Sequence, residues 1–177
     1  MYHAALAHVP DKPDCTEEES RLMTKGFIYT IAAASLALAG SAIAAPVAPD
    51  DVKFNDDFEV KASLTGEAGD PAAGRAAFAD RKKGNCLACH AATDLKDQLF
   101  HGEVGPSLDG VADRYSADQL RAIIVDSKQV FGEQTVMPGF YSMHVGADVD
   151  EKFAGKTILS AQEVEDVVAY LTTLKEQ

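Results

Sequence analysis

Three residues within one five-residue stretch carry the clearest chemistry in this sequence. Cys86 and Cys89 are separated by two residues, and His90 follows the second cysteine directly. Two thiols at this spacing can face the same porphyrin edge and add to its two vinyl groups as thioethers, and the next residue then places an imidazole under the iron. The pattern predicts one covalently bound haem c, with Cys86 and Cys89 as anchors and His90 as an axial ligand.

Other uses of such a cysteine pair fit the chain less well. A thioredoxin-like dithiol needs a βαβ context, and the sequence has no alternating strand pattern of useful length. A zinc half-site needs two more cysteine or histidine ligands at similar spacing, and only His101 and His144 remain downstream. Haem attachment is therefore the preferred interpretation.

The second axial ligand is expected further along the chain. The candidates are His101, Met137, Met143 and His144. Met137 is favoured because Pro138 follows it and stiffens the backbone that would hold the thioether over the iron. Met143 and the two histidines stay open as alternatives, although His101 follows the cysteine motif so closely that we expect it on the surface or in a loop. The ordinary use of any methionine is core packing.

Three further residues are candidates for the surroundings of the haem. A ligating histidine usually donates its other ring N–H to a backbone carbonyl, and the carbonyl of Pro106 in the Gly105-Pro106 turn is the candidate acceptor for His90. Arg114 and Tyr115 could hydrogen-bond a haem propionate. The alternatives are an ordinary loop turn, a solvated arginine and a core tyrosine.

Helices are expected to position these residues. Asp70 is an N-cap before Pro71, and the alanine-rich stretch 72–83 predicts a helix that runs into a glycine. A second helix should begin at Ser116, where Gln119 completes a capping box. Its expected apolar face consists of Leu120, Ile123, Ile124 and Val130.

The last helix should begin at Ser160, where Glu163 completes another capping box. Gly74 would let the first helix approach another helix closely, and Phe78 and Tyr170 would pack at that crossing. The expected apolar stripe of the last helix is Val164, Val167, Val168, Leu171 and Leu174.

These elements predict an all-α domain of three to four short helices with long loops at 91–110 and 132–155. Loops of this length in so small a domain need something to wrap around, and a haem would supply it. The predicted cytochrome domain spans 70–177, and 45–69 is expected to be an extended N-terminal arm without a core of its own.

The first 44 residues are expected to lie outside the fold. Lys25 followed by the apolar run 27–39 and small residues up to Ala44 predicts a signal peptide at 23–44, cleaved after Ala44, and hence a periplasmic protein. A membrane anchor is the alternative, but prolines end the apolar stretch short of the roughly 20 residues that a span needs. The acidic segment 1–22 is expected to be a mis-assigned start, with a disordered leader as the alternative.

Charge narrows the classes of partner. The net charge is −12, which disfavours nucleic acid and anionic membrane as partners and favours a protein with a basic docking face. Plain solubility is the alternative explanation. After signal cleavage only two of the three cysteines remain, so we expect this chain to transfer electrons without supplying a catalytic cysteine.

These features together resemble class I cytochromes c over residues 70–177, and four segments resemble the SoxX family of monohaem cytochromes. The segments are 84–90, 105–115 (GPSLDGVADRY), 135–141 (TVMPGFY) and 155–171 (GKTILSAQEVEDVVAYL). Gly139 departs mildly from the pattern, because alanine or another small residue is expected there.

The resemblance implies a class I cytochrome c fold and a partner of the SoxA type, a haem protein with a reactive cysteine. It also implies a complex, the SoxAX L-cysteine S-thiosulfotransferase, that oxidatively couples thiosulfate to the carrier SoxYZ and passes electrons to a small cytochrome c. His90 and Met137 carry over as axial ligands. The alternatives are a freely diffusing periplasmic electron carrier and a haem enzyme or gas sensor with an open iron site.

Overall fold

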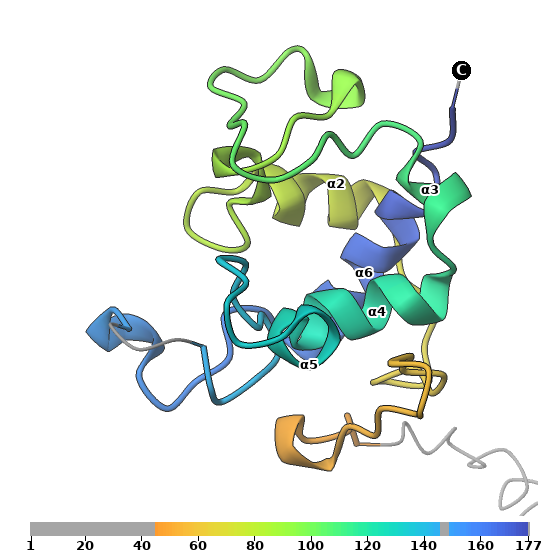
Figure 1. The fold of residues 1–177 in the computed structure, drawn as a ribbon, viewed down its shortest axis with the longest axis vertical. Helices are drawn as coiled ribbons and strands as arrows, with labels where there is room; N and C mark the ends of the chain where they lie inside the picture. The colour runs from red at the N-terminus through yellow and green to blue at the C-terminus, as the bar shows by residue number, and fades with distance from the viewer. Residues whose placement is uncertain (1–44, 146–148, 177) are drawn as a thin grey trace, which may run out of the picture. The chain divides into compact units, whose positions relative to one another are not determined.

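Helices and long loops account for residues 45–145 and 149–176, which are the residues described by this computed structural model (Figure 1). Within these ranges there is no β-strand, in agreement with the all-α prediction. The α-helices are α2 (Pro71–Ala79), α3 (Val111–Arg114), α4 (Ala117–Val125), α5 (Ser127–Phe131) and α6 (Ala161–Leu171). The 3-10 helices are η1 (Pro49–Asp51), η2 (Cys86–Ala88), η3 (Thr93–Leu95) and η4 (Glu151–Phe153).

Helix α2 begins where the sequence predicts and ends earlier. The Asp70 side chain accepts a hydrogen bond from the Ala72 N–H at the helix start. The helix stops at Ala79 and does not reach Lys83, because Asp80 offers the chain a competing turn. Its carboxylate accepts from the Lys82 N–H and its carbonyl accepts from the Lys83 N–H.

Both predicted capping boxes are present. Ser116 and Gln119 form the first at the start of α4, and Ser160 and Glu163 form the second at the start of α6. Helix α4 ends at Val125, and the short α5 follows after a break, so that Val130 lies on a separate helix. The one-turn helices α3 and α5 are additional to the expected ones.

The predicted helix crossing joins α2 to α6, which Figure 1 shows side by side. A β-carbon on Gly74 would lie 1.9 Å from the Asp166 carbonyl oxygen, so only glycine permits this approach. Phe78 and Tyr170 meet edge to face with ring centroids 5.6 Å apart. The crossing forms the frame from which the cysteine motif leaves α2.

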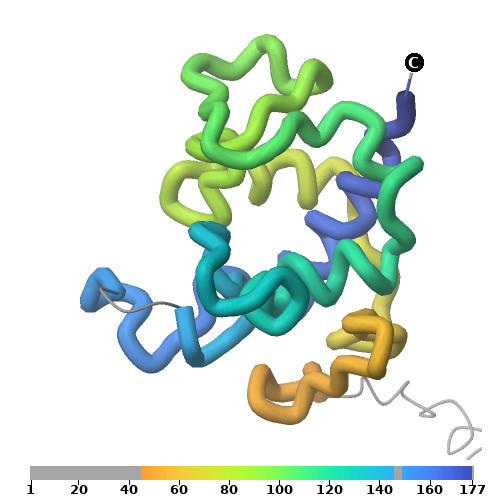
Figure 2. Tube along the Cα trace, viewed as in Figure 1, coloured from red at the N-terminus to blue at the C-terminus, as the bar shows by residue number. Residues whose placement is uncertain are grey.

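The N-terminal arm, residues 45–69, contributes to the core of this frame. It does not run extended as predicted but folds back on itself (Figure 2), so that the Val47 N–H reaches the Leu64 carbonyl at 2.7 Å. Val60 and Leu64 are fully buried, and the Val60 carbonyl accepts from Arg121 of α4. Arg121 of α4 and Glu165 of α6 form a buried ion pair, with Nε and Oε1 2.9 Å apart. This pair holds the arm in place through hydrogen bonds to the backbone of Val60 and Leu64. The arm therefore shares the core of the cytochrome domain and has none of its own.

None of the helices in residues 45–145 and 149–176 has both the length and the apolar character needed to cross a membrane. The predicted signal peptide at 23–44 and the segment 1–22 lie outside the described residues.

Candidate haem site

The cysteine motif forms a tight turn directly after α2. Helix η2 closes with hydrogen bonds from the Cys89 N–H (3.1 Å) and the His90 N–H (2.9 Å) to the Cys86 carbonyl. The turn is entered through Asn85 in the left-handed region, with φ of 47°. Cys86 and Cys89 form no disulfide. Cys86 is buried and its pKa is raised to about 12 by desolvation, whereas Cys89 is half-buried.

The imidazole of His90 has a fixed orientation. Its Nδ1–H donates to the Pro106 carbonyl at 2.8 Å, which is the hydrogen bond that the sequence predicts for this pair. Since Nδ1 is engaged by the protein, Nε2 is the nitrogen that can bind a metal. Gly105 packs against the ring so closely that a β-carbon there would lie 2.3 Å from Cε1 of His90.

The loop that carries Pro106 is braced from two sides. The Arg114 guanidinium donates to the carbonyls of Ser107 (2.9 Å) and Asp109 (2.7 Å). The Asp109 carboxylate accepts from the backbone N–H and the hydroxyl of Thr93, and these hydrogen bonds hold its pKa below the usual range. These contacts connect the segment after His90 to the segment that holds its acceptor.

The predicted surrounding residues Arg114 and Tyr115 lie at the end of α3. Two N–H groups of Arg114 are used by the loop carbonyls, and Tyr115 is exposed at 36% and is therefore not a core residue. Their predicted contact with a propionate stays a prediction.

Met137 lies on a loop that backbone contacts fasten to α4 and α5. The side chain is half-buried against the hydrophobic core, and its carbonyl accepts from the Ser127 hydroxyl. The Phe140 N–H donates to the Ile124 carbonyl (3.0 Å), and the Tyr141 N–H donates to the Val125 carbonyl (3.1 Å). A β-carbon on Gly139 would lie 2.8 Å from the Ser142 β-carbon, which explains the glycine at this position.

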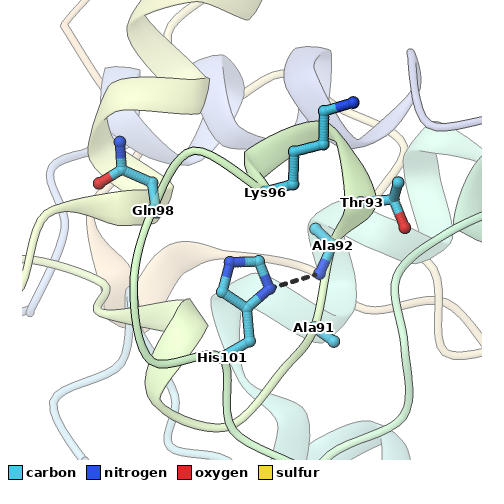
Figure 3. Close-up of a pocket in the computed structure, with 6 residues that line it drawn as sticks. All are labelled: Ala91, Ala92, Thr93, Lys96, Gln98 and His101. Carbon is cyan, nitrogen blue, oxygen red and sulfur yellow. Dashed lines mark hydrogen bonds between the residues drawn. The ribbon is translucent and has the colours of Figure 1, made fainter.

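The alternative ligand candidates have different surroundings. Met143 and His144 are exposed on the chain beyond this loop. Both ring nitrogens of His101 are engaged by backbone: Nδ1 accepts from the Ala92 N–H (3.4 Å) and Nε2–H donates to the Leu95 carbonyl (3.0 Å). Figure 3 shows His101 at the edge of a surface cavity of about 310 Å³, where the ring closes the loop that begins after His90.

Residues 45–145 and 149–176 bring together no group of three or more His, Cys, Asp or Glu side chains that could hold a bare metal ion. The donor set of the motif is of another kind. Haem c requires two cysteines on one turn, an imidazole with Nε2 available and, for a sixth ligand, a thioether on a fixed loop. Cys86 and Cys89, His90, and the half-buried Met137 supply these groups. The residues present therefore fit a covalently attached haem.

Several residues that shape this site have no signal in the sequence. Ser127 precedes Met137 by ten residues, and no spacing rule links a helix-start serine to a distant carbonyl. The space that Gly105 leaves for His90 is likewise a tertiary feature. Tyr141 stands within the segment 135–141, but the sequence assigns it no role.

Comparison with known proteins agrees with this geometry. The family model described as cytochrome c matches residues 71–175. Among solved structures, the chain is similar to a chain of the crystal structure of SoxXA from P. pantotrophus, with 41% sequence identity and a TM-score of 0.68 over 75% of this chain and 100% of that chain. Curated protein sequences gave no match. The chain therefore belongs to the cytochrome c family and is a SoxX-type electron-transfer subunit with covalently bound haem.

Proposed function

We propose that Cys86 and Cys89 hold a single haem c through thioether bonds, and that His90 and Met137 are its axial ligands. The observation that carries the proposal is the hydrogen bond from His90 Nδ1–H to the Pro106 carbonyl, which leaves Nε2 as the ligating atom. Met137 is the half-buried thioether among the candidates, whereas Met143 is exposed at 38%.

The bound haem supplies a one-electron redox centre. The protein's part is to hold the imidazole through Pro106, to fasten the Met137 loop through the Ser127 hydroxyl, and to pack the thioether against the hydrophobic core. Arg114 retains N–H donors beyond the two that hold the loop, and we propose that these and the Tyr115 hydroxyl face a propionate.

The chain would act as the electron-transfer subunit of a SoxAX-type L-cysteine S-thiosulfotransferase, with a SoxA-type haem subunit as partner. That complex would couple thiosulfate to a SoxYZ carrier, and this subunit would pass the electrons to a small cytochrome c. The support is the similarity to the SoxXA chain along its whole length. Both cysteines among the described residues are used by the haem in this proposal, so the sulfur chemistry would take place on the partner.

The chain would work in the periplasm, because haem is attached to c-type cytochromes outside the cytoplasm. We propose that 23–44 is a cleaved signal peptide and that the mature protein consists of the arm at 45–69 and the cytochrome domain from residue 70. Residues 1–22 would not be part of the mature protein.

A docked subunit fits the surface better than a freely diffusing carrier does. Leu99, Phe100 and Val104 lie on one loop and are exposed at 74%, 78% and 69%. Large apolar side chains exposed on one loop are typical of a surface that contacts another protein.

Copurification tests the proposal. The tagged chain, matured with haem, should co-elute with a SoxA-type subunit in gel filtration. Its haem should become reduced when thiosulfate and the SoxYZ carrier are both present with that subunit, and stay oxidised when either is missing. Elution alone with every candidate partner, together with reduction by general donors, would favour the carrier instead.

A further inference from the structure

The N-terminal arm reaches the loop of Met137 at Val47. The Val47 N–H donates to the Leu64 carbonyl at 2.7 Å, so the start of the arm is tied to its own buried end. The Val47 carbonyl accepts from the Tyr141 hydroxyl at 2.6 Å, across 94 positions of sequence. Val47 itself is half-buried and packs against the hydrophobic core.

On the other side of this contact, Tyr141 is an integral part of the Met137 loop. It lies four residues after Met137 and is 6% exposed. Its N–H is bonded to the Val125 carbonyl at the end of α4, which ties its backbone to that helix while the loop is closed. Burial raises the pKa of Tyr141, so the phenol stays protonated and its O–H remains a donor.

The backbone of Val60 and Leu64, at the other end of the arm, is hydrogen-bonded to two charged side chains in the core. The Leu64 N–H donates to the Glu165 carboxylate at 2.8 Å, and the Val60 carbonyl accepts from Arg121 at 2.8 Å. Arg121 and Glu165 are 8% and 4% exposed and are paired with each other. The Val60 N–H also donates to the Asp118 carbonyl at 3.1 Å. This end of the arm is thus held on both α4 and α6.

A continuous chain of bonded groups therefore runs from the Arg121–Glu165 pair, through Leu64 and Val47, to Tyr141. Its last member shares a short loop with Met137. We propose that the N-terminal arm clamps this loop through the hydrogen bond between Val47 and Tyr141, and that Tyr141 is a positioning residue for the Met137 thioether. The inference rests on the proposed ligation of the haem iron by Met137.

The clamp predicts a measurable exchange of ligands. An added imidazole can bind ferric iron at the sixth position only when the Met137 thioether leaves, and the loop must open for this to happen. Breaking one buried hydrogen bond that exists only in the closed loop should favour opening by about three- to ten-fold. The same coupling acts in reverse, because displacing the thioether must loosen the clamp by an equal factor.

The first experiment compares two matched substitutions in the full mature holoprotein. Tyr141→Phe removes only the hydroxyl that bonds Val47. Tyr170→Phe is the control, because Tyr170 is also buried (3% exposed) and donates to Asp94 at 2.9 Å, away from the Met137 loop. Optical titration of the ferric proteins should show an apparent affinity for imidazole about three- to ten-fold higher in Tyr141→Phe, and unchanged in Tyr170→Phe.

A second measurement uses the wild-type protein and so does not depend on either variant folding. Saturating imidazole should speed amide hydrogen exchange at Val47 several-fold and leave exchange in α2 unchanged. Equal imidazole affinities in the two variants, or unchanged exchange at Val47, would overturn the clamp while leaving the proposed function intact. A wild-type ferric protein without a methionine–iron charge-transfer band would instead overturn the ligation by Met137, and the clamp with it.

Discussion

Substitution of Gly105 by alanine tests whether the Gly-Pro turn sets the position of the His90 ring. The added β-carbon would lie 2.3 Å from Cε1 and 2.6 Å from Nδ1 of His90. Carbon atoms in contact normally stand about 3.5–4.0 Å apart, so the ring or the loop must shift by more than about 1 Å. Overpacking of this kind usually costs about 1–3 kcal/mol of unfolding free energy.

The ring has little freedom to make this shift. The His90 backbone N–H closes the η2 turn, and its ring Nδ1–H is bonded to the Pro106 carbonyl. The loop must therefore retreat, which lengthens the hydrogen bond from His90 to the Pro106 carbonyl. A weaker hydrogen bond makes the imidazole a poorer electron donor to iron, so the reduction potential of the Gly105→Ala holoprotein should rise.

The assay combines denaturant unfolding with a spectroelectrochemical titration of the haem. Gly155→Ala is a suitable control: Gly155 has φ of 66° and an open surround, so alanine there should cost about 1–2 kcal/mol through backbone strain alone. The control should lose stability and keep the wild-type potential. A Gly105→Ala protein with wild-type stability and potential would refute the reasoning.

Three further outcomes follow from the same contacts. Glu165→Gln should remove the buried carboxylate beside Arg121 and leave that guanidinium only the more exposed Asp118 carboxylate, 3.0 Å away, so the free energy of unfolding should fall by up to about 3–5 kcal/mol; a loss below about 1 kcal/mol in denaturant titration would contradict this. Hydrogen bonds to Thr93 lower the pKa of Asp109 in the folded protein. The carboxylate therefore contributes to stability at pH values above the ordinary aspartate pKa of about 4, and this contribution is lost as pH falls through the lower folded-state pKa. Unfolding of wild type and Asp109→Asn should thus differ at pH 7 and converge in strong acid, and a constant difference would argue against this role. Met137→Ala should open the iron to CO in the reduced protein and lower the reduction potential; absence of CO binding by optical spectroscopy would point to another ligand.

Local signals in the sequence were sufficient where short-range chemistry decides the structure. The capping boxes at Ser116 and Ser160 fix the starts of α4 and α6, because each depends on residues three positions apart. The end of α2 was predicted wrongly, because the Asp80 side chain and carbonyl form a turn that helix propensity does not reveal.

Long-range contacts set the limit of prediction. Cys86, Cys89 and His90 lie within five residues of one another, so the sequence alone predicts them as a site. The role of the arm depends on Arg121 and Glu165, which lie 44 positions apart and pair only after α4 and α6 have packed. Tyr141 and Val47 are further apart still. No periodicity or spacing rule connects such residues, so the support around Met137 could be found only in the structure.

The attachment of the haem is the most direct test of the account. The exported protein, produced with a working cytochrome maturation system, should be denatured, extracted with acidified solvent and measured by intact and peptide mass spectrometry. The account predicts that the colour stays with the polypeptide, that the mass exceeds the mature chain by one haem, and that the modified peptide contains Cys86 and Cys89. Release of the haem into the solvent, or an unmodified peptide, would contradict it.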